Sequence, residues 1–117
     1  MGMQVVFVIG PDWTLRTTVR AELRELGIKA LGMESADDVG RALGAGEMPS
    51  AIVLEAVSHL AADPAIRNLV SHVPTVLIAS RTEEVELPPV TAVLYRPVRI
   101  AEILNYVKEL LQQPRLA

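Results

Sequence analysis

The stretch Ala51-Ile52-Val53-Leu54-Glu55-Ala56 decides the fold of this chain. Four apolar residues in a row precede a single acid, and two of the four are β-branched. A short apolar run of this kind is typical of a strand buried on both faces, as in a parallel sheet covered by helices. In open α/β sheets, sites are built at the carboxyl edge of the strands. We therefore expect Glu55 to be the centre of a site, or what remains of one.

The rest of the chain alternates strand and helix patterns around this strand. Strands are predicted at residues 4–9, 28–33, 51–55, 75–80 and 91–95, and helices at 14–26, 36–43, 64–72 and 100–113. Residues 56–62 are predicted as loop, and residues 81–89 as an exposed loop with at most one helical turn. This alternation predicts an α/β fold, a doubly wound five-stranded parallel sheet of flavodoxin-like order 2-1-3-4-5.

Length, charge and composition exclude several classes of partner. The 117 residues suit a single domain, 1–117, with a core at about 4–111 and a tail or linker start at 112–117. The net charge is −3, and the basic residues look scattered with no basic stripe, which argues against nucleic acid. There are no cysteines, which fits a cytoplasmic location. No apolar run reaches the roughly 18 residues of a spanning helix, so no membrane partner is expected.

Three landmarks make the chain resemble a known family. They are the strand that ends in Glu55, the strand Pro74-Thr-Val-Leu-Ile, and the turn Leu94-Tyr95-Arg96-Pro97, which resembles a Lys-Pro turn before a last helix. Together with the order of elements, they resemble the receiver domain of two-component response regulators over about residues 4–111. The resemblance implies a role in signal transduction or a phosphorelay, and a partner-binding helix between the fourth and fifth strands, which here looks shortened or missing.

The residues that carry the chemistry of that family are replaced. The resemblance implies two adjacent acids after the first strand, a phosphoacceptor aspartate, a Ser or Thr after the fourth strand, an aromatic switch residue and a lysine. In this chain those places hold Gly10 and Pro11 (with Asp12 following), Glu55, Ala79, Val93 and Arg96. Each replacement removes or alters a group that the family's phosphoryl transfer would use.

These replacements predict a domain without phosphoryl transfer. Magnesium prefers several hard oxygen ligands, and Gly10 and Pro11 offer no side-chain oxygen. We therefore expect no metal, no cofactor and no enzymatic activity. A bidentate pair between Arg96 and Glu55 would resemble a permanently occupied state, with Glu55 in the place of the charged acyl phosphate. The hypothesis is a degenerate receiver, a pseudo-receiver held in one state.

Structural interpretations of the same residues stay open. One interpretation of Glu55 is a structural acid, paired with Arg96 or solvated, because structural ion pairs are commoner than working acids. Asp12 is a preferred type for a helix cap, which competes with a role as metal ligand. Trp13 either packs over its loop or is half exposed at a binding surface, where tryptophan is enriched.

The expected function is contact with another protein or with a second copy, as in a homodimer. The expected surface comprises the last strand, the last helix and the loop at 81–89, and the interface candidates are Trp13, Tyr95 and Val107. One alternative is a small-ligand sensor that uses a cleft at the carboxyl edge. Its expected lining is Gly10, Pro11, Trp13, Glu55 and Arg96. A further alternative is an unconventional phosphoacceptor that uses Asp12 or Glu55.

Overall fold

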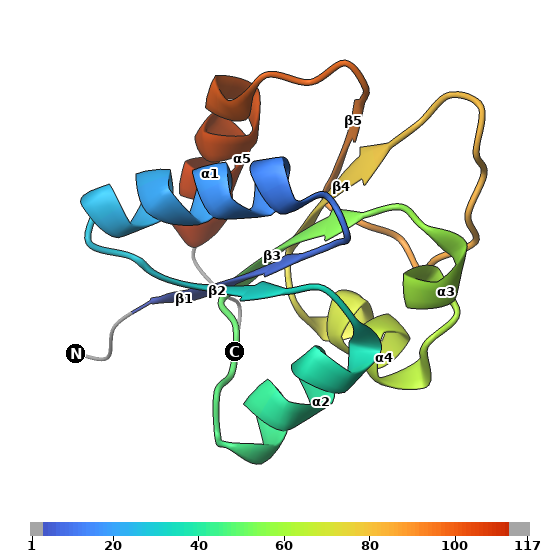
Figure 1. Ribbon diagram of the computed structural model, residues 1–117, viewed down its shortest axis with the longest axis horizontal. Helices are drawn as coiled ribbons and strands as arrows, with labels where there is room; N and C mark the ends of the chain where they lie inside the picture. The colour runs from blue at the N-terminus through green and yellow to red at the C-terminus, as the bar shows by residue number, and fades with distance from the viewer. Residues whose placement is uncertain (1–3, 113–117) are drawn as a thin grey trace.

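A five-stranded parallel sheet forms the centre of the molecule (Figure 1). The structure is a computed structural model and describes residues 4–112. The strand order is β2-β1-β3-β4-β5, as the sequence predicts. The strands are β1 (Val5–Ile9), β2 (Lys29–Met33), β3 (Ala51–Glu55), β4 (Thr75–Ala79) and β5 (Ala92–Tyr95).

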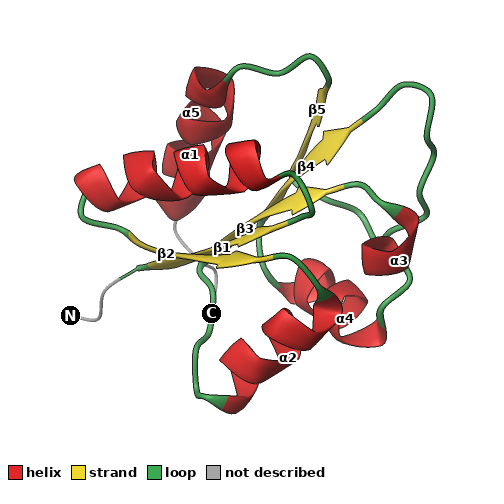
Figure 2. Ribbon diagram, in the orientation of Figure 1, coloured by secondary structure: helices red, strands yellow, loops and turns green. Residues whose placement is uncertain are grey.

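Helices cover both faces of this sheet (Figure 2). Two of them, α1 (Trp13–Glu25) and α5 (Ile100–Gln112), lie together on one face. The other face carries α2 (Ala36–Gly44), α3 (Ser58–Ala61) and α4 (Pro64–His72). No helix within residues 4–112 is long and apolar enough to cross a membrane.

The central strand β3 is buried along its whole length. Val53 packs into the apolar cluster beneath α1 and α5, whereas Ile52 and Leu54 pack into the cluster beneath α2 and α4. Successive residues of a strand point to opposite faces, so one apolar run serves two cores. The next residue, Glu55, is thereby placed at the carboxyl edge between the two helical layers.

Three helices begin at side-chain caps. Asp12, Ser35 and Asp63 each accept a hydrogen bond from the backbone N–H three residues later, at 3.1, 3.3 and 3.1 Å. Each such cap contributes about 1 kcal/mol. The cap at Asp12 starts α1 at Trp13, one residue before the predicted start, and confirms the capping interpretation of this aspartate.

The prediction of a loop at residues 56–62 is wrong, because Ser58–Ala61 forms the short helix α3. Leu60 and Ala61 are buried on it. A single turn is too short to show a helical repeat in the sequence, so burial of these two side chains decides the conformation. Residues 113–117, most of the expected tail, lie outside the described residues.

Residues 80–91, between β4 and β5, contain no helix, as the sequence predicts. Val85, Leu87 and Val90 pack on the apolar cluster that α2 and α4 cover. Arg67 of α4 donates a hydrogen bond of 2.7 Å to the carbonyl of Glu86. An irregular segment therefore connects β4 to β5, and two side chains of β5, Val93 and Tyr95, are exposed.

Candidate functional site

Glu55 is buried, with 4% of its surface exposed, and both of its carboxylate oxygens are occupied. Oε2 accepts a hydrogen bond from the backbone N–H of Asp12 at 2.9 Å. Oε1 accepts one from Nη2 of Arg96 at 2.5 Å. Charge-assisted hydrogen bonds are about twice as strong as neutral ones. The carboxylate is therefore held in one position by the start of α1 on one side and the end of β5 on the other.

Gly10 makes room for this carboxylate. A Cβ atom placed on Gly10 would lie 1.8 Å from Oε2 of Glu55 and 2.4 Å from its Cδ. Non-bonded carbon contacts are ordinarily about 3.5–4.0 Å, so no side chain fits at this position while Glu55 keeps its place. The glycine at position 10 and the long acid at position 55 are thus one structural arrangement.

Arg96 bridges two carboxylates. In addition to its bond with Glu55, its Nη1 lies 3.4 Å from Oδ2 of Asp12. The prediction of a bidentate Arg96–Glu55 pair is therefore wrong in its geometry. The other oxygen of Asp12 caps α1, so this aspartate sits close enough to take the second guanidinium nitrogen. The backbone N–H of Arg96 donates to the carbonyl of Ala79 at 2.8 Å, which fixes where the side chain starts.

Arg16 is a further member of the site, and sequence reasoning missed it. Its Nη1 donates a hydrogen bond of 2.7 Å to the carbonyl of Gly10. The sequence did hold a signal for this contact. Arg16 lies one helical turn after the cap at Asp12, so its long side chain can reach back to the turn that precedes the helix. This contact fixes the turn between β1 and α1, and with it the N–H that binds Glu55.

The charges of the site respond to burial and to hydrogen bonding. Burial raises the pKa of the Glu55 carboxyl, and the Asp12 N–H and the charge of Arg96 oppose this rise. The backbone N–H of Leu15 lowers the pKa of Asp12, with a further contribution from Arg96. Asp12 is therefore the more readily ionised of the two acids, and Arg96 stands between them.

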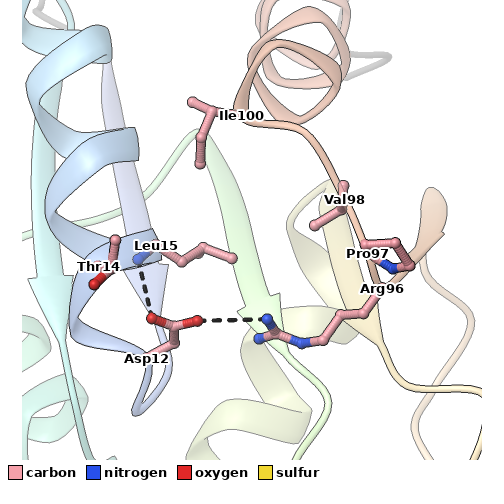
Figure 3. Close-up of a pocket in the computed structure, with 7 residues that line it drawn as sticks. All are labelled: Asp12, Thr14, Leu15, Arg96, Pro97, Val98 and Ile100. Carbon is pink, nitrogen blue, oxygen red and sulfur yellow. Dashed lines mark hydrogen bonds and ion pairs between the residues drawn. The ribbon is translucent and has the colours of Figure 1, made fainter.

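An open groove of about 550 Å³ lies beside the ion pair (Figure 3). It is lined by Asp12, Thr14, Leu15, Arg96, Pro97, Val98 and Ile100. Figure 3 shows the carboxylate of Asp12 and the guanidinium of Arg96 pointing toward each other, with the side chains of Leu15, Val98 and Ile100 above them. The predicted lining of a small-ligand cleft differs, because only Arg96 of that set lines this groove. Glu55 closes over Gly10 and leaves no space there.

The side chains of the other predicted site residues make no hydrogen bond to this cluster. Ala79 is buried at the end of β4 and brings no hydroxyl to the site. The hydroxyl of Ser80 faces that of Thr82 at 2.8 Å, outside the cluster. Pro11 is exposed in the turn. Within residues 4–112, no group of three or more His, Cys, Asp or Glu residues is placed to hold a metal ion.

The interface candidates fall into two groups. Trp13 is 67% exposed and Tyr95 is 46% exposed, and Val93 beside Tyr95 on β5 is 41% exposed. The guanidinium carbon of Arg81 lies 4.6 Å from the centre of the Tyr95 ring. Val107 is fully buried, so its assignment to an interface is wrong. It lies on the face of α5 that packs on the sheet.

Comparisons with known proteins bear on the fold. No family model and no curated protein sequence matches the chain. Among solved structures, it is similar to a response regulator receiver protein from Pseudomonas putida, with a TM-score of 0.71, 13% identity, and coverage of 93% of this chain and 98% of that one. A receiver protein from Sinorhizobium medicae gives a TM-score of 0.71 at 16% identity, with coverage of 93% of this chain and 94% of that one. A receiver protein from Burkholderia phymatum gives a TM-score of 0.68 at 19% identity, with coverage of 92% of this chain and 94% of that one. The chain therefore has a receiver-like fold.

Proposed function

We propose that this chain is a receiver-like signalling domain that works without phosphorylation and acts through contact with another protein. One observation carries the proposal. The position that would accept a phosphoryl group holds Glu55, whose two oxygens are bound by the Asp12 N–H and by Arg96. Glu55 also fills the space next to Gly10 that an acidic side chain would need.

The same contacts argue against transfer chemistry. An incoming phosphoryl group needs its developing charge neutralised, and a metal ion usually does this. Asp12 directs one oxygen to the cap of α1 and the other toward Arg96. In this site the guanidinium of Arg96 already faces the Glu55 carboxylate, and Arg16 adds a second positive charge nearby. The arrangement supports a static ion-pair cluster in place of a switch.

The contact surface that we propose is the side of β5 that no helix covers. Val93 and Tyr95 are two residues apart on this strand, so they share one face, and both are exposed. The segment between β4 and β5 borders this surface. Exposed aromatic side chains are enriched at protein interfaces, which favours contact with another protein or a second copy.

Treatment with acetyl phosphate and Mg²⁺, followed by intact mass, tests the absence of phosphorylation. We expect no gain of a phosphoryl group in the wild-type chain or in Glu55→Gln. A gain in the wild-type chain that Glu55→Gln abolishes would make Glu55 a phosphoacceptor and refute the proposal. A gain of phosphoryl mass that persists in Glu55→Gln but disappears in Asp12→Asn would make Asp12 the phosphoacceptor, and would also refute the proposal.

A second candidate is a small-ligand sensor, which the groove in Figure 3 favours. Its volume of about 550 Å³ lies within the range of about 300–1,000 Å³ of ligand pockets. A thermal shift against a panel of metabolites tests it, because a ligand at 100 times its dissociation constant adds about 2.7 kcal/mol of stability. A hit should weaken in Leu15→Ala, which changes the apolar wall and leaves the Glu55 contacts in place.

A further inference from the structure

Three arginines line one side of α1. Arg16, Arg20 and Arg24 are spaced four residues apart, and helical geometry places such residues on one side. Nη2 of Arg24 donates to the carbonyl of Ala30 at 3.4 Å, so this side faces the edge strand β2. The description of the basic residues as scattered is therefore wrong, because the helix gathers three of them. We call these residues the arginine stripe.

Strand β2 makes room for the stripe. A Cβ atom on Gly32 would lie 2.6 Å from Cδ of Arg20 and 3.1 Å from Cγ of Arg16. The glycine therefore allows the arginine stems to lie against the edge of the sheet. Their charged ends are held at a defined place on the surface, and less conformational freedom remains to be lost on binding.

The arginine stripe makes no ion pair within residues 4–112. No carboxylate there forms an ion pair with Arg16, Arg20 or Arg24. Nε of Arg20 is buried without a hydrogen-bond partner, while its terminal nitrogens are not among the buried unpaired atoms. Burial, and repulsion from Arg24 and Arg16, lower the pKa of Arg20. An anion placed here would relieve both the repulsion and the incomplete hydration.

The same chain presents an exposed acidic segment. Glu84 and Glu86 are exposed, whereas Val85 and Leu87 are half-buried against the apolar cluster of the opposite face. This alternation is typical of an extended segment and puts both glutamates on the outer side. Arg67 holds the carbonyl of Glu86 at 2.7 Å, so the segment is anchored. Neither glutamate forms an ion pair with any residue from 4 to 112.

The spacings of the two charged features match. Residues four apart on a helix are about 6 Å apart along its axis. Residues two apart in an extended segment are about 6.6–6.8 Å apart. The two features cannot meet within one molecule. The stripe lies at the β2 edge with α1, and the acidic segment lies at the β5 end on the face of α3 and α4 (Figure 1).

We propose that the arginine stripe of one molecule binds the acidic segment of a second copy. The inference rests on the proposed function in that it uses the segment between β4 and β5 as a contact surface. Guanidinium and carboxylate groups pair with good geometry, and two such pairs fit the matched spacing. The two surfaces are different patches of the molecule, so the contact is heterologous and repeats head to tail.

Sedimentation velocity of the whole chain tests the proposal. At about 0.01 M ionic strength charges act over about 30 Å, and at about 1 M over about 3 Å. We expect the sedimentation coefficient of the wild-type chain to rise with concentration at low salt and to stay constant at high salt. The stripe variant Arg20→Gln with Arg24→Gln should stay monomeric, and so should the segment variant Glu84→Gln with Glu86→Gln.

Mixing the two variants gives the sharpest result. Each retains one intact surface, so an equimolar mixture should form a 1:1 complex that grows no further. Both variants keep a net negative charge, so general attraction does not explain a complex. The control Glu22→Gln with Glu109→Gln removes two exposed acids elsewhere and should associate like the wild type. Circular dichroism confirms that each variant is folded.

Three results would overturn the proposal. The first is a wild-type chain that stays monomeric at low salt. The second is association that survives in both variants. The third is a rise in the melting temperature of the wild type, but not of the stripe variant, when inorganic phosphate is added and no self-association occurs. The stripe would then be a binding site for a small anion. None of these results changes the acetyl phosphate experiment, so a failure here is distinguishable from a failure of the proposed function.

Discussion

Replacing Gly10 with alanine should destabilise the fold by displacing one side chain, that of Glu55. The new Cβ would lie 1.8 Å from Oε2 of Glu55, 2.4 Å from Cδ and 2.5 Å from Cγ, so small adjustments cannot relieve the contact. Glu55 must leave its place and give up its bonds to the Asp12 N–H and to Arg96. Backbone strain is not the cause, because the φ angle of Gly10 is not positive.

The expected cost is about 3 kcal/mol. A hydrogen bond to a charged group contributes about 1.5–3 kcal/mol, and breaking a buried ion pair costs about 3–5 kcal/mol. We expect the lower end, because the Arg96 side chain is 40% exposed and keeps Asp12 as a partner. At about 2.1 cal/mol/K of unfolding entropy per residue, 1 kcal/mol corresponds to about 4 °C for 117 residues. The melting temperature should therefore fall by about 12 °C.

A double-mutant cycle isolates the contact. In a Glu55→Ala background the space is vacant, and Gly10→Ala should be neutral or should stabilise by about 0.4–1 kcal/mol through the unfolded chain. Urea unfolding followed by far-ultraviolet circular dichroism measures all four free energies of unfolding. Fluorescence is a weaker probe, because Trp13 is already 67% exposed in the folded state.

The control is the same substitution at Gly40, inside α2. A Cβ there meets nothing within 4 Å, so Gly40→Ala should stabilise the fold by up to about 1 kcal/mol, the helix propensity difference. If Gly10→Ala costs the same with and without Glu55, to within about 0.5 kcal/mol, the two sites are uncoupled. The account of Gly10 as the space for Glu55 would then be refuted.

Four further predictions concern the ion-pair cluster and the arginine stripe. Arg96→Ala should lower the free energy of unfolding by about 2–3 kcal/mol, since buried Glu55 loses its charged partner; an unchanged melting temperature contradicts this. Burial raises the pKa of Glu55 in the fold, so stability should fall as pH rises from about 4.5 through the raised value, and Glu55→Gln should remove that fall in urea titrations. The pKa of Asp12 is lowered in the fold, so its effect on stability has the opposite pH dependence: stability should fall as pH drops below about 3.8. Asp12→Asn should reduce this loss. Gly32→Ala should cost under about 1 kcal/mol, because the clashing Cδ belongs to the flexible Arg20 side chain, yet it should weaken low-salt self-association.

The sheet was predictable because each of its strands and helices has its own recognisable pattern of apolar residues. The buried run before Glu55 and the strand–helix alternation settle the strand order without any knowledge of contacts. Capping residues such as Asp12 placed a helix start to within one residue. The helix Ser58–Ala61 was missed because one turn carries no periodic signal, and only the burial of Leu60 decides it.

The details of the site were less predictable because they depend on pairs of residues far apart in the chain. The sequence named Glu55 and Arg96, but it could not show that Arg96 would share its two terminal nitrogens between Glu55 and Asp12. Val107 looked like an interface residue from its place on the last helix. Which side of that helix faces the sheet is set by packing, and the structure puts Val107 inside.

The residues at positions 10, 55 and 96 form one structural unit. A glutamate at position 55 needs a glycine at position 10, because its carboxylate fills the volume of a side chain there. Its position then brings Oε1 within reach of a long guanidinium at position 96, and Oε2 within reach of the Asp12 N–H. Their fit is that of a structural clamp: the Asp12 N–H binds Glu55 at the start of α1, and Arg96 binds it at the end of β5.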